Sequence, residues 1–311
     1  MTAPAPAPAQ VPAPKADTRA LIVLMIGAAA IGFAPIFVRL TETGPAAAGF
    51  WRLLFALPWL LLLAFRPGVK TEGAGVPWKW TGLAGMFFAL DLLFWHYGVT
   101  YTSVTNATVL TNLTPVVVTL SAWFFFRERP RRMFVAGLAL ALAGAMTMAF
   151  SHSGAQGVNP PLGDLLSVVT ALWYGGYFLA IGRARQAADA TRVMLWSTAI
   201  GAPLLLVAAL VLREDLRPDS LAGWGACAAL GVVHVVGQGA IAWSLGRLPT
   251  ALASVVVFVQ PVVAAGLGWA IFGEPVGLIQ GLGGVIALVG VAVAQRSAAK
   301  KTSAETGAAT A

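Results

Sequence analysis

Apolar residues gather in runs of about 20 along almost the whole chain, and short polar segments separate the runs. A run of that length crosses the hydrocarbon core of a bilayer as an α-helix, which satisfies its own backbone hydrogen bonds in lipid. We therefore predict an all-α integral membrane protein with ten transmembrane helices. The expected spans are residues 20–40, 45–65, 78–99, 103–126, 132–150, 161–182, 192–212, 221–245, 249–272 and 276–295.

Two stretches of the chain repeat one pattern. Residues 114–130 read TPVVVTLSAWFFFRERP, and residues 260–275 read QPVVAAGLGWAIFGEP. An offset of 146 residues aligns Pro, Trp and Glu and continues through two glycines without a gap. The aligned pairs are Pro115 with Pro261, Trp123 with Trp269, Glu128 with Glu274, Gly137 with Gly283, and Gly144 with Gly290. Apolar helices can agree by composition alone, but this register favours a duplication.

The duplication divides the spans into two halves of five, residues 19–150 and 161–296. Because five is odd, the second half must enter the membrane from the opposite side, so we predict inverted repeats. Inverted repeats are typical of secondary transporters, whose substrate site lies near the midplane where the halves meet. We expect a central cavity there. Residues 1–18 are rich in Pro and Ala, and we expect them and residues 297–311 to form disordered cytoplasmic tails.

Composition excludes several classes of protein. Hydrophobic residues make up 58% of the 311 positions and charged residues 10%, too few charges for a soluble surface. The net charge is +8, but the basic residues are spread over short loops, so we expect no nucleic-acid partner. The single Cys227 builds no disulfide or zinc framework, and HExxH, Walker and GxSxG motifs are absent. We expect neither an enzyme nor a cofactor or bound metal.

Lysine and arginine are distributed unequally between the loops. With the N-terminus inside, the inner segments hold sixteen of the twenty, and the outer segments hold Arg39, Arg213 and Arg217. Arg52 falls within a span. Because positive residues stay on the cytoplasmic side, both termini should be cytoplasmic.

The ten spans, the two halves and the Pro…Trp…Glu stretch that ends each fourth helix resemble the drug/metabolite transporter superfamily, in its EamA-type branch. The resemblance covers roughly residues 20–296 and includes bacterial exporters of amino acids, aromatic ones among them. It implies a multi-pass transporter with a small-molecule substrate, in the inner (plasma) membrane of a bacterium. Small four-helix multidrug relatives use a membrane-embedded Glu in their first helix. The equivalent spans here lack such an acid, apart from Asp164 at the start of span 6, which argues against proton-for-cation exchange.

A polar stripe marks one face of span 4. Its members recur at spacings of three and four residues, namely Thr105, Thr108, Asn112, Pro115 and Thr119. Such residues either line a cavity or hold helices together, and the sequence leaves both open. Pro115 and Pro261 each remove a backbone hydrogen bond, so we expect a helix bend at each. Each bend is either a pivot for alternating access or a static kink.

Further candidates lie in spans 2, 3, 6 and 8. Ionisable groups inside a membrane are costly and usually face a cavity or a partner, which singles out Asp91 and Arg52 for proton or carboxylate handling. His96 is either a wall of the substrate pocket or a structural histidine bonded to a neighbouring helix. As substrate-binding residues we expect His96, Tyr101, Asn112, Trp173, Tyr177 and Gln238.

These observations favour a secondary exporter, and we expect a monomer in the lipid bilayer. The predicted substrates are amino acids or similar small metabolites, with aromatic or apolar side chains favoured. No ATP site is visible, so alternating access by facilitated diffusion is the first expectation, and a proton-coupled multidrug or metabolite antiporter is the alternative. A sensory or scaffolding protein would have no use for an inverted duplication. A lipid-modifying enzyme would need clustered acids, histidines or cysteines, which the spans lack.

Overall fold

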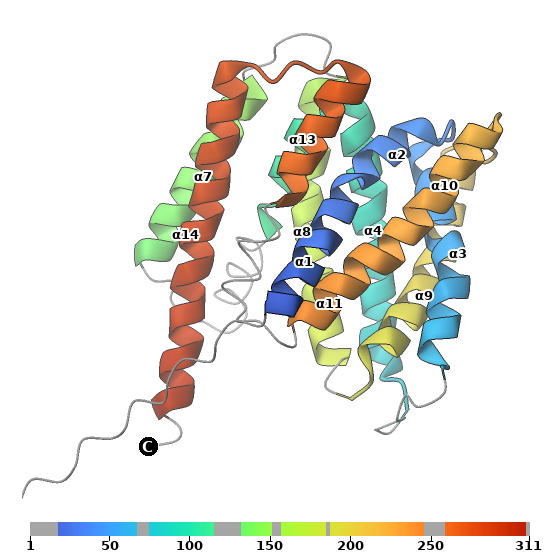
Figure 1. Cartoon of the computed structure of the whole chain (residues 1–311), viewed down its shortest axis with the longest axis horizontal. Coiled ribbons are helices and arrows are strands. Elements are labelled where there is room, and N and C mark those ends of the chain that lie inside the picture. Colours follow the sequence, from blue (N-terminus) through green and yellow to red (C-terminus); the bar gives the residue numbers. More distant parts are fainter. Residues whose placement is uncertain are drawn as a thin grey trace, which may run out of the picture.

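The computed structural model describes residues 18–66, 75–114, 132–150, 157–184, 187–245 and 259–308, and its regular elements in these ranges are all helical (Figure 1). The first repeat contains α1 (Thr18–Gly32), α2 (Ala34–Leu40), α3 (Pro45–Ala64), α4 (Trp78–Tyr101), α5 (Val104–Thr111) and α7 (Arg132–Phe150). The second contains α8 (Pro160–Ala184), α9 (Ala190–Val211), α10 (Leu221–Val233), the π-helical turn η1 (His234–Gln238), α11 (Gly239–Leu245), α13 (Val259–Phe272) and α14 (Leu278–Ala308). The predicted fold class is confirmed.

Two spans are interrupted, and in span 1 a proline is the cause. In a continuous span 1, the ring of Pro35 would clash with the carbonyl of Ile31. The first helix therefore ends at Gly32, and Pro35 lies in the first turn of α2, where a missing N–H breaks no helical bond. Span 8 is divided by the π-helical turn, which places an extra residue in the helix. Both interruptions change the direction in which neighbouring side chains point.

The outer surface of the bundle is apolar. Six helical spans in the described ranges are long and apolar enough to cross a membrane when α1 is counted with α2 and α10 with η1, and shorter apolar helices cover Arg132–Met148, Val259–Phe272 and Leu278–Val293. Large side chains such as Leu62, Val211 and Leu278 are 68%, 73% and 79% exposed. Contact with lipid removes the cost that water would impose on this apolar surface. The last helix continues to Ala308, past the residue where we expected a disordered tail to begin.

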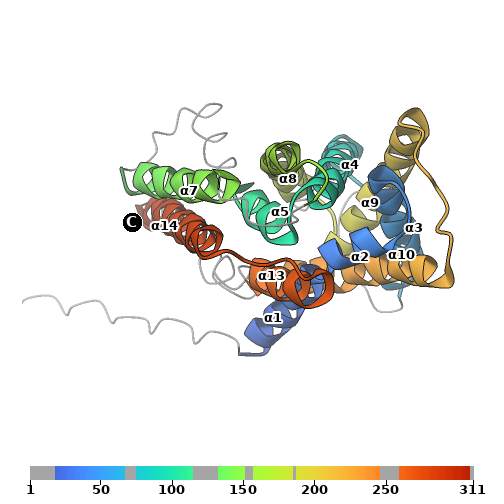
Figure 2. The same cartoon turned by 90° about the horizontal axis from the view of Figure 1, so that it is seen from above.

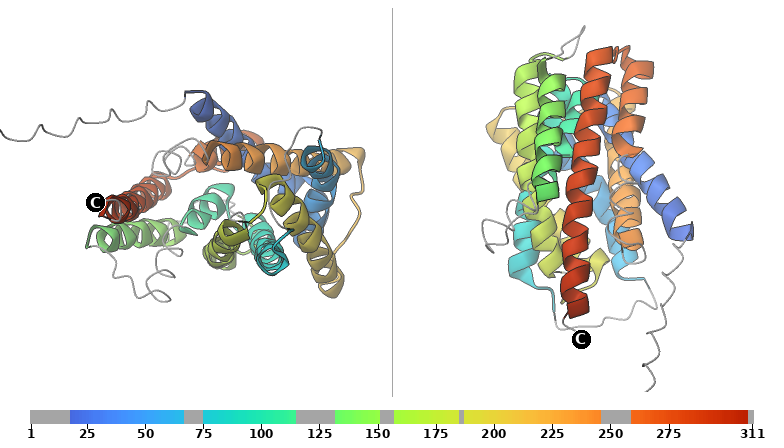
Figure 3. Two further views of the ribbon diagram at one scale, coloured as in Figure 1. Left: turned by 90° about the horizontal axis from the view of Figure 1, so that it is seen from below. Right: turned by 90° about the vertical axis from the view of Figure 1, so that its left-hand side faces the viewer.

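Helices α7 and α14 pack side by side, and their contact has two-fold symmetry (Figures 1 and 3). Gly144 lies against the backbone of Gly283 and Ala287, where an added Cβ would collide. Gly290 lies in the same way against Gly137 and Ala141. The offset of 146 residues converts each of these contacts into the other. Residues later in α7 therefore contact residues earlier in α14, which means that the two helices are antiparallel. Because they are equivalent helices of the two repeats, the repeats are inverted.

The remaining helices surround a packed centre. Viewed end-on, the α7–α14 pair stands at one edge beside α5 and α13, whereas α3, α9 and α10 stand at the opposite edge (Figure 2). Phe88 and Leu92 of α4, Leu53 of α3, Leu205 of α9 and Tyr177 of α8 form a buried apolar cluster. This cluster fixes the positions of α3, α4 and α8, which supply much of the site described next.

Candidate functional site: a polar cavity between the two repeats

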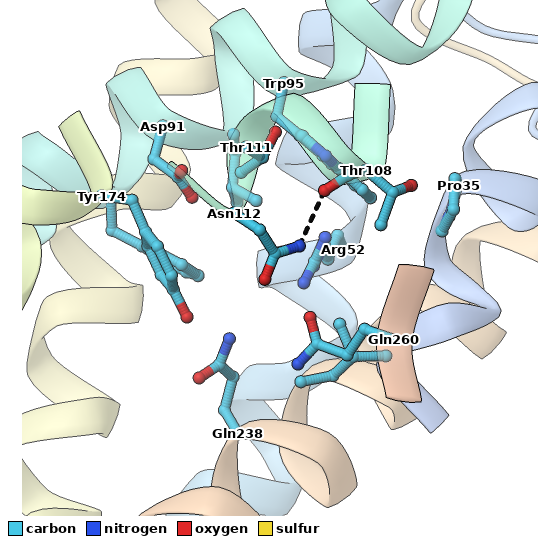
Figure 4. Close-up of a pocket in the computed structure, with 13 residues that line it drawn as sticks. Pro35, Arg52, Asp91, Trp95, Thr108, Thr111, Asn112, Tyr174, Gln238 and Gln260 are labelled. Atoms are coloured by element: carbon cyan, nitrogen blue, oxygen red, sulfur yellow. Dashed lines mark hydrogen bonds between the residues drawn. The ribbon is translucent and has the colours of Figure 1, made fainter. Parts of the chain in front are cut away.

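A cavity lies where helices of the two repeats meet (Figure 4). The first repeat contributes residues from α1, α2, α3, α4 and the end of α5, and the second contributes residues from α8, η1 and α13. Its water-accessible volume is about 70 Å³. The wall consists of Ile31, Pro35, Arg52, Phe88, Asp91, Leu92, Trp95, Thr108, Thr111, Asn112, Tyr174, Gln238 and Gln260.

Two opposite charges reach this cavity from neighbouring helices. Arg52 of α3 is 3% exposed and Asp91 of α4 is 6% exposed. The guanidinium carbon of Arg52 stands 5.7 Å from the ring centroid of Trp95, a cation–π contact that orients it. Its Nε has no hydrogen-bond partner in the described part of the chain. The ion pair found among the described residues joins Arg39 and Glu274, so Arg52 and Asp91 do not form one with each other.

Neutral polar groups complete the wall. The side-chain amide nitrogen of Asn112 donates to the carbonyl of Thr108 at 2.7 Å, so its oxygen is left to face the cavity (Figure 4). Tyr174 interacts with the side chain of Gln238 across the opening. Gln260 approaches from α13 of the second repeat (Figure 4). Each repeat thus supplies both polar and apolar surface to one space.

One side of the bundle, called the capped end here, is formed by the connections at residues 41–44, 102–103, 212–220 and 273–277. Carboxylates there cap helix N-termini of the other repeat. Glu42 accepts hydrogen bonds from the backbone N and hydroxyl of Ser220, at the start of α10. Glu214 accepts from the backbone N–H groups of Ala46 and Ala47 in α3, and from the hydroxyl of Tyr97. Negative charge at a helix N-terminus is stabilising.

The third inter-repeat cap includes the ion pair. Glu274 accepts from the backbone N of Val104 at 2.9 Å, at the start of α5, and it pairs with Arg39 of α2. Arg39 also donates to the carbonyls of Val99 and Thr102, at 2.8 and 2.5 Å. The C-terminal ends of α2 and α13 are therefore held against the α4–α5 connection. These bonds close the capped end in this conformation.

Comparisons with known proteins agree with this geometry. The EamA-like transporter family matches the chain twice, over residues 18–150 and 161–295. The chain belongs to the EamA-like transporter family. The two matches cover the two inverted repeats, so this EamA-like transporter is a duplicated, multi-pass integral membrane protein and not an enzyme.

Individual relatives support the same family. The chain is 25% identical over 252 residues to the pseudopaline exporter CntI of Pseudomonas aeruginosa, covering 80% of this chain and 86% of the relative. It is 23% identical over 287 residues to an uncharacterised transporter of Archaeoglobus fulgidus, covering 88% and 96%. A protein crystal structure with 18% identity superposes with a TM-score of 0.62, covering 89% of this chain and 98% of that chain. This last likeness concerns the fold alone.

Five residues singled out by sequence line the cavity of this EamA-like transporter. They are Arg52, Asp91, Asn112 and Gln238, and Thr108 of the polar stripe. Their positions have separate causes. The first two lie on the buried faces of α3 and α4, Asn112 follows the last turn of α5, and Gln238 ends the π-helical turn.

The other four expected substrate-binding residues lie outside the lining. The ring Nδ1 of His96 is 2.9 Å from the carbonyl oxygen of Pro45, which ties α4 to the start of α3. Tyr101 ends α4 at the capped end and contacts the ring of Tyr97. Trp173 packs against Phe87 and Phe94 on the α4–α8 contact.

Tyr177 forms a second layer behind the cavity wall. It stacks on Phe88 and on Tyr174, with ring centroids 4.8 and 5.9 Å away, and both of these residues line the cavity.

Of the two prolines at which helix bends were expected, the structure describes one. Pro115 lies outside the described residues, and Pro261 is buried in α13, whose described part begins two residues earlier, at Val259.

Several lining residues were not among the expected substrate-binding set. Tyr174 precedes Tyr177 by three residues, so both lie toward one side of α8, and the sequence does not tell which of them reaches the cavity. Gln260 is a polar residue in an apolar run directly before Pro261, and that position was the available signal. Trp95 is recognisable only once Arg52 is placed over its ring.

Proposed function

We propose that this EamA-like transporter exports amino acids or similar small metabolites with apolar or aromatic side chains. The observation that carries the proposal is the cavity itself. It is lined by both repeats, holds buried charged and amide groups for a polar head, and has Phe88, Leu92 and Ile31 for an apolar side chain. Similarity to a protein named as a metabolite exporter, the pseudopaline exporter CntI, supports export of a small metabolite.

Alternating access would act through contacts between the repeats. The caps made by Glu42, Glu214 and Glu274 all join one repeat to the other, so they must break for the capped end to open. The interruptions at Gly32–Ala34 and in η1 lie beside the cavity and offer points where spans 1 and 8 can flex. Pro115 and Pro261 remain proposed pivots in spans 4 and 9.

The proposed orientation places the capped end on the far side of a bacterial inner membrane from the cytoplasm. Arg39, Arg213 and Arg217 belong to that end, whereas Arg183 and Arg192 belong to the opposite end, with most of the basic residues of the sequence. The positive-inside rule then makes both termini cytoplasmic. We expect an impermeant thiol reagent to label Val276→Cys from the side opposite the cytoplasm. Labelling from the cytoplasmic side alone would contradict the proposed orientation.

We propose transport by facilitated diffusion, driven by the concentration gradient of the substrate. Asp91 is the single acid among the described lining residues, so the cavity offers few groups that could carry a proton. That same acid also keeps the alternative open. A proton-coupled multidrug or metabolite antiporter would use Asp91 to exchange a proton for a cationic substrate.

Flux in proteoliposomes separates the two mechanisms. We expect liposomes with the purified transporter to take up phenylalanine, methionine or tryptophan along their concentration gradients, with or without a pH gradient. Empty liposomes and liposomes with heat-denatured protein are the controls. Uptake of quaternary cations that depends strictly on the pH gradient, together with no amino-acid flux, would replace this proposal with the antiporter.

A further inference from the structure

The cavity contains two buried charged groups that no ion pair joins, and such groups need an explanation. Arg52 and Asp91 are both almost fully buried, the ion pair found among the described residues is Arg39–Glu274, and Nε of Arg52 has no hydrogen-bond partner there. A charge removed from water is strongly destabilising unless hydrogen bonds or a counter-charge compensate it. Each group lies in the electric field of the other, which offsets part of that cost. Their remaining hydrogen-bonding capacity is directed at the cavity (Figure 4).

The arrangement of these two groups favours one kind of ligand charge. A ligand with only a carboxylate would pair with Arg52 but be repelled by Asp91. A ligand with only an ammonium group would meet the opposite problem. A ligand that carries both groups compensates both buried charges at once and leaves the site neutral. Figure 4 shows the side chain of Asn112 between those of Arg52 and Asp91, and all three residues line the cavity.

We infer that Arg52 and Asp91 recognise the two charges of a zwitterionic substrate, with Arg52 binding its carboxylate and Asp91 its ammonium group. This inference deepens the proposed amino-acid transport and rests on it for the location of the substrate. Arg52 suits a carboxylate because the guanidinium presents parallel N–H donors to two oxygens. Trp95 keeps that group in place from one side, so its N–H donors need little reorganisation when a ligand binds.

The uncharged residues of the lining can contact the remaining parts of such a ligand. The free oxygen of Asn112 can accept from the ammonium group beside Asp91. The amide of Gln260 can bond the carboxylate on the side of Arg52, as its position in Figure 4 allows. Ile31, Pro35 and Phe88 then remain to contact the apolar side chain. This division predicts selectivity by charge at one part of the cavity and by shape at the other.

Three probes with the same phenyl group test the charge selectivity. L-Phenylalanine carries both charges, 2-phenylethylamine lacks the carboxylate, and 3-phenylpropanoate lacks the ammonium group. Binding is measured with the purified full chain in detergent, as the ligand-dependent rise of the unfolding temperature. For the wild-type protein we expect phenylalanine to bind about tenfold or more tightly than either of the other probes.

The variants assign each charge to one residue. Arg52→Gln should weaken binding of phenylalanine and 3-phenylpropanoate about 10- to 100-fold and leave 2-phenylethylamine unaffected or tighter. Asp91→Asn should weaken phenylalanine and 2-phenylethylamine but not 3-phenylpropanoate. Arg183→Gln removes an arginine that stacks on Trp80 outside the cavity, and it should change none of the three affinities. Arg52→Lys should keep the preference for phenylalanine over 2-phenylethylamine.

Several results would overturn the inference. They are equal weakening of all three probes in Arg52→Gln, equal binding of the three probes by the wild-type protein, and no binding of any probe. If the charge-removing variants do not fold, the order of the probes on the wild-type protein decides. Proteoliposome flux separates this inference from the proposed function. Charge-selective binding without phenylalanine flux would reject transport alone, and flux without charge selectivity would reject the inference alone.

Discussion

His96 joins two helices from a position outside the cavity. Its Nδ1 donates to the carbonyl of Pro45, because a carbonyl oxygen can only accept. The ring is fully buried and lies close to Gly49. This geometry corresponds to the structural histidine that the sequence left as an alternative to a pocket wall. The contact with Pro45 accounts for Nδ1, whereas Nε2 is buried without a hydrogen-bond partner among the described residues.

Substitution of His96 separates the two roles. We expect His96→Ala to lower the free energy of unfolding by about 1–3 kcal/mol, because the Pro45 carbonyl loses its partner in a buried site. His96→Asn should recover part of the loss, since its amide N–H can take the place of Nδ1–H. Thermal unfolding and phenylalanine binding are measured on the same preparations. A large loss of affinity with unchanged stability in His96→Ala would return this residue to the substrate site.

The sequence was informative about which residues are unusual and less informative about what they touch. Arg52 and Asp91 stood out because ionisable groups inside a membrane are costly, and both line the cavity. Trp173 stood out as a mid-span aromatic, but it packs between α4 and α8 instead. An apolar helix in lipid has no polar outer face, so periodicity does not reveal which side faces the centre. The contacts between helices in the structure show which side of each helix faces the centre.

At the scale of helices, the two-fold contact between α7 and α14 is the clearest record of the duplication. Its glycines were found in sequence as aligned pairs, and the structure brings members of different pairs together, Gly144 with Gly283 and Gly290 with Gly137. Small residues let helix backbones approach closely in membranes. The alignment could not foresee this exchange, because register between helices depends on the whole bundle.

Equivalent positions in this contact should respond equally to substitution. Gly144→Ala and Gly290→Ala each place a Cβ against backbone, and we expect each to lower the free energy of unfolding by about 1–3 kcal/mol. Gly266→Ala is the matched control, because nothing lies within 4 Å of its added Cβ. It should be neutral or slightly stabilising through better helix propensity. Thermal unfolding in detergent measures all three. A loss at one glycine and none at its equivalent would contradict the symmetric contact.

At the scale of the whole molecule, the two inverted repeats line one cavity, which in the proposed mechanism opens to each face of the membrane in turn. The capped end is closed by caps that join one repeat to the other, through Glu42, Glu214 and Glu274. Inverted repeats can exchange conformations, so that the equivalent contacts of the other end form when these break. The span count and the odd number of helices per repeat predicted this architecture. The closed end itself was not predictable, because its bonds join residues as far apart as Arg39 and Glu274.

The most direct test of transport through this cavity is side-resolved labelling of a cysteine at position 111. Thr111 lines the cavity, and Thr111→Cys is made in a Cys227→Ser background so that one thiol remains. Val276→Cys and Ala187→Cys are controls that identify the two sides. We predict that an impermeant thiol reagent labels position 111 from either side in separate experiments, and that phenylalanine slows both reactions. Labelling from one side only, at a rate that phenylalanine does not change, would contradict alternating access through the cavity.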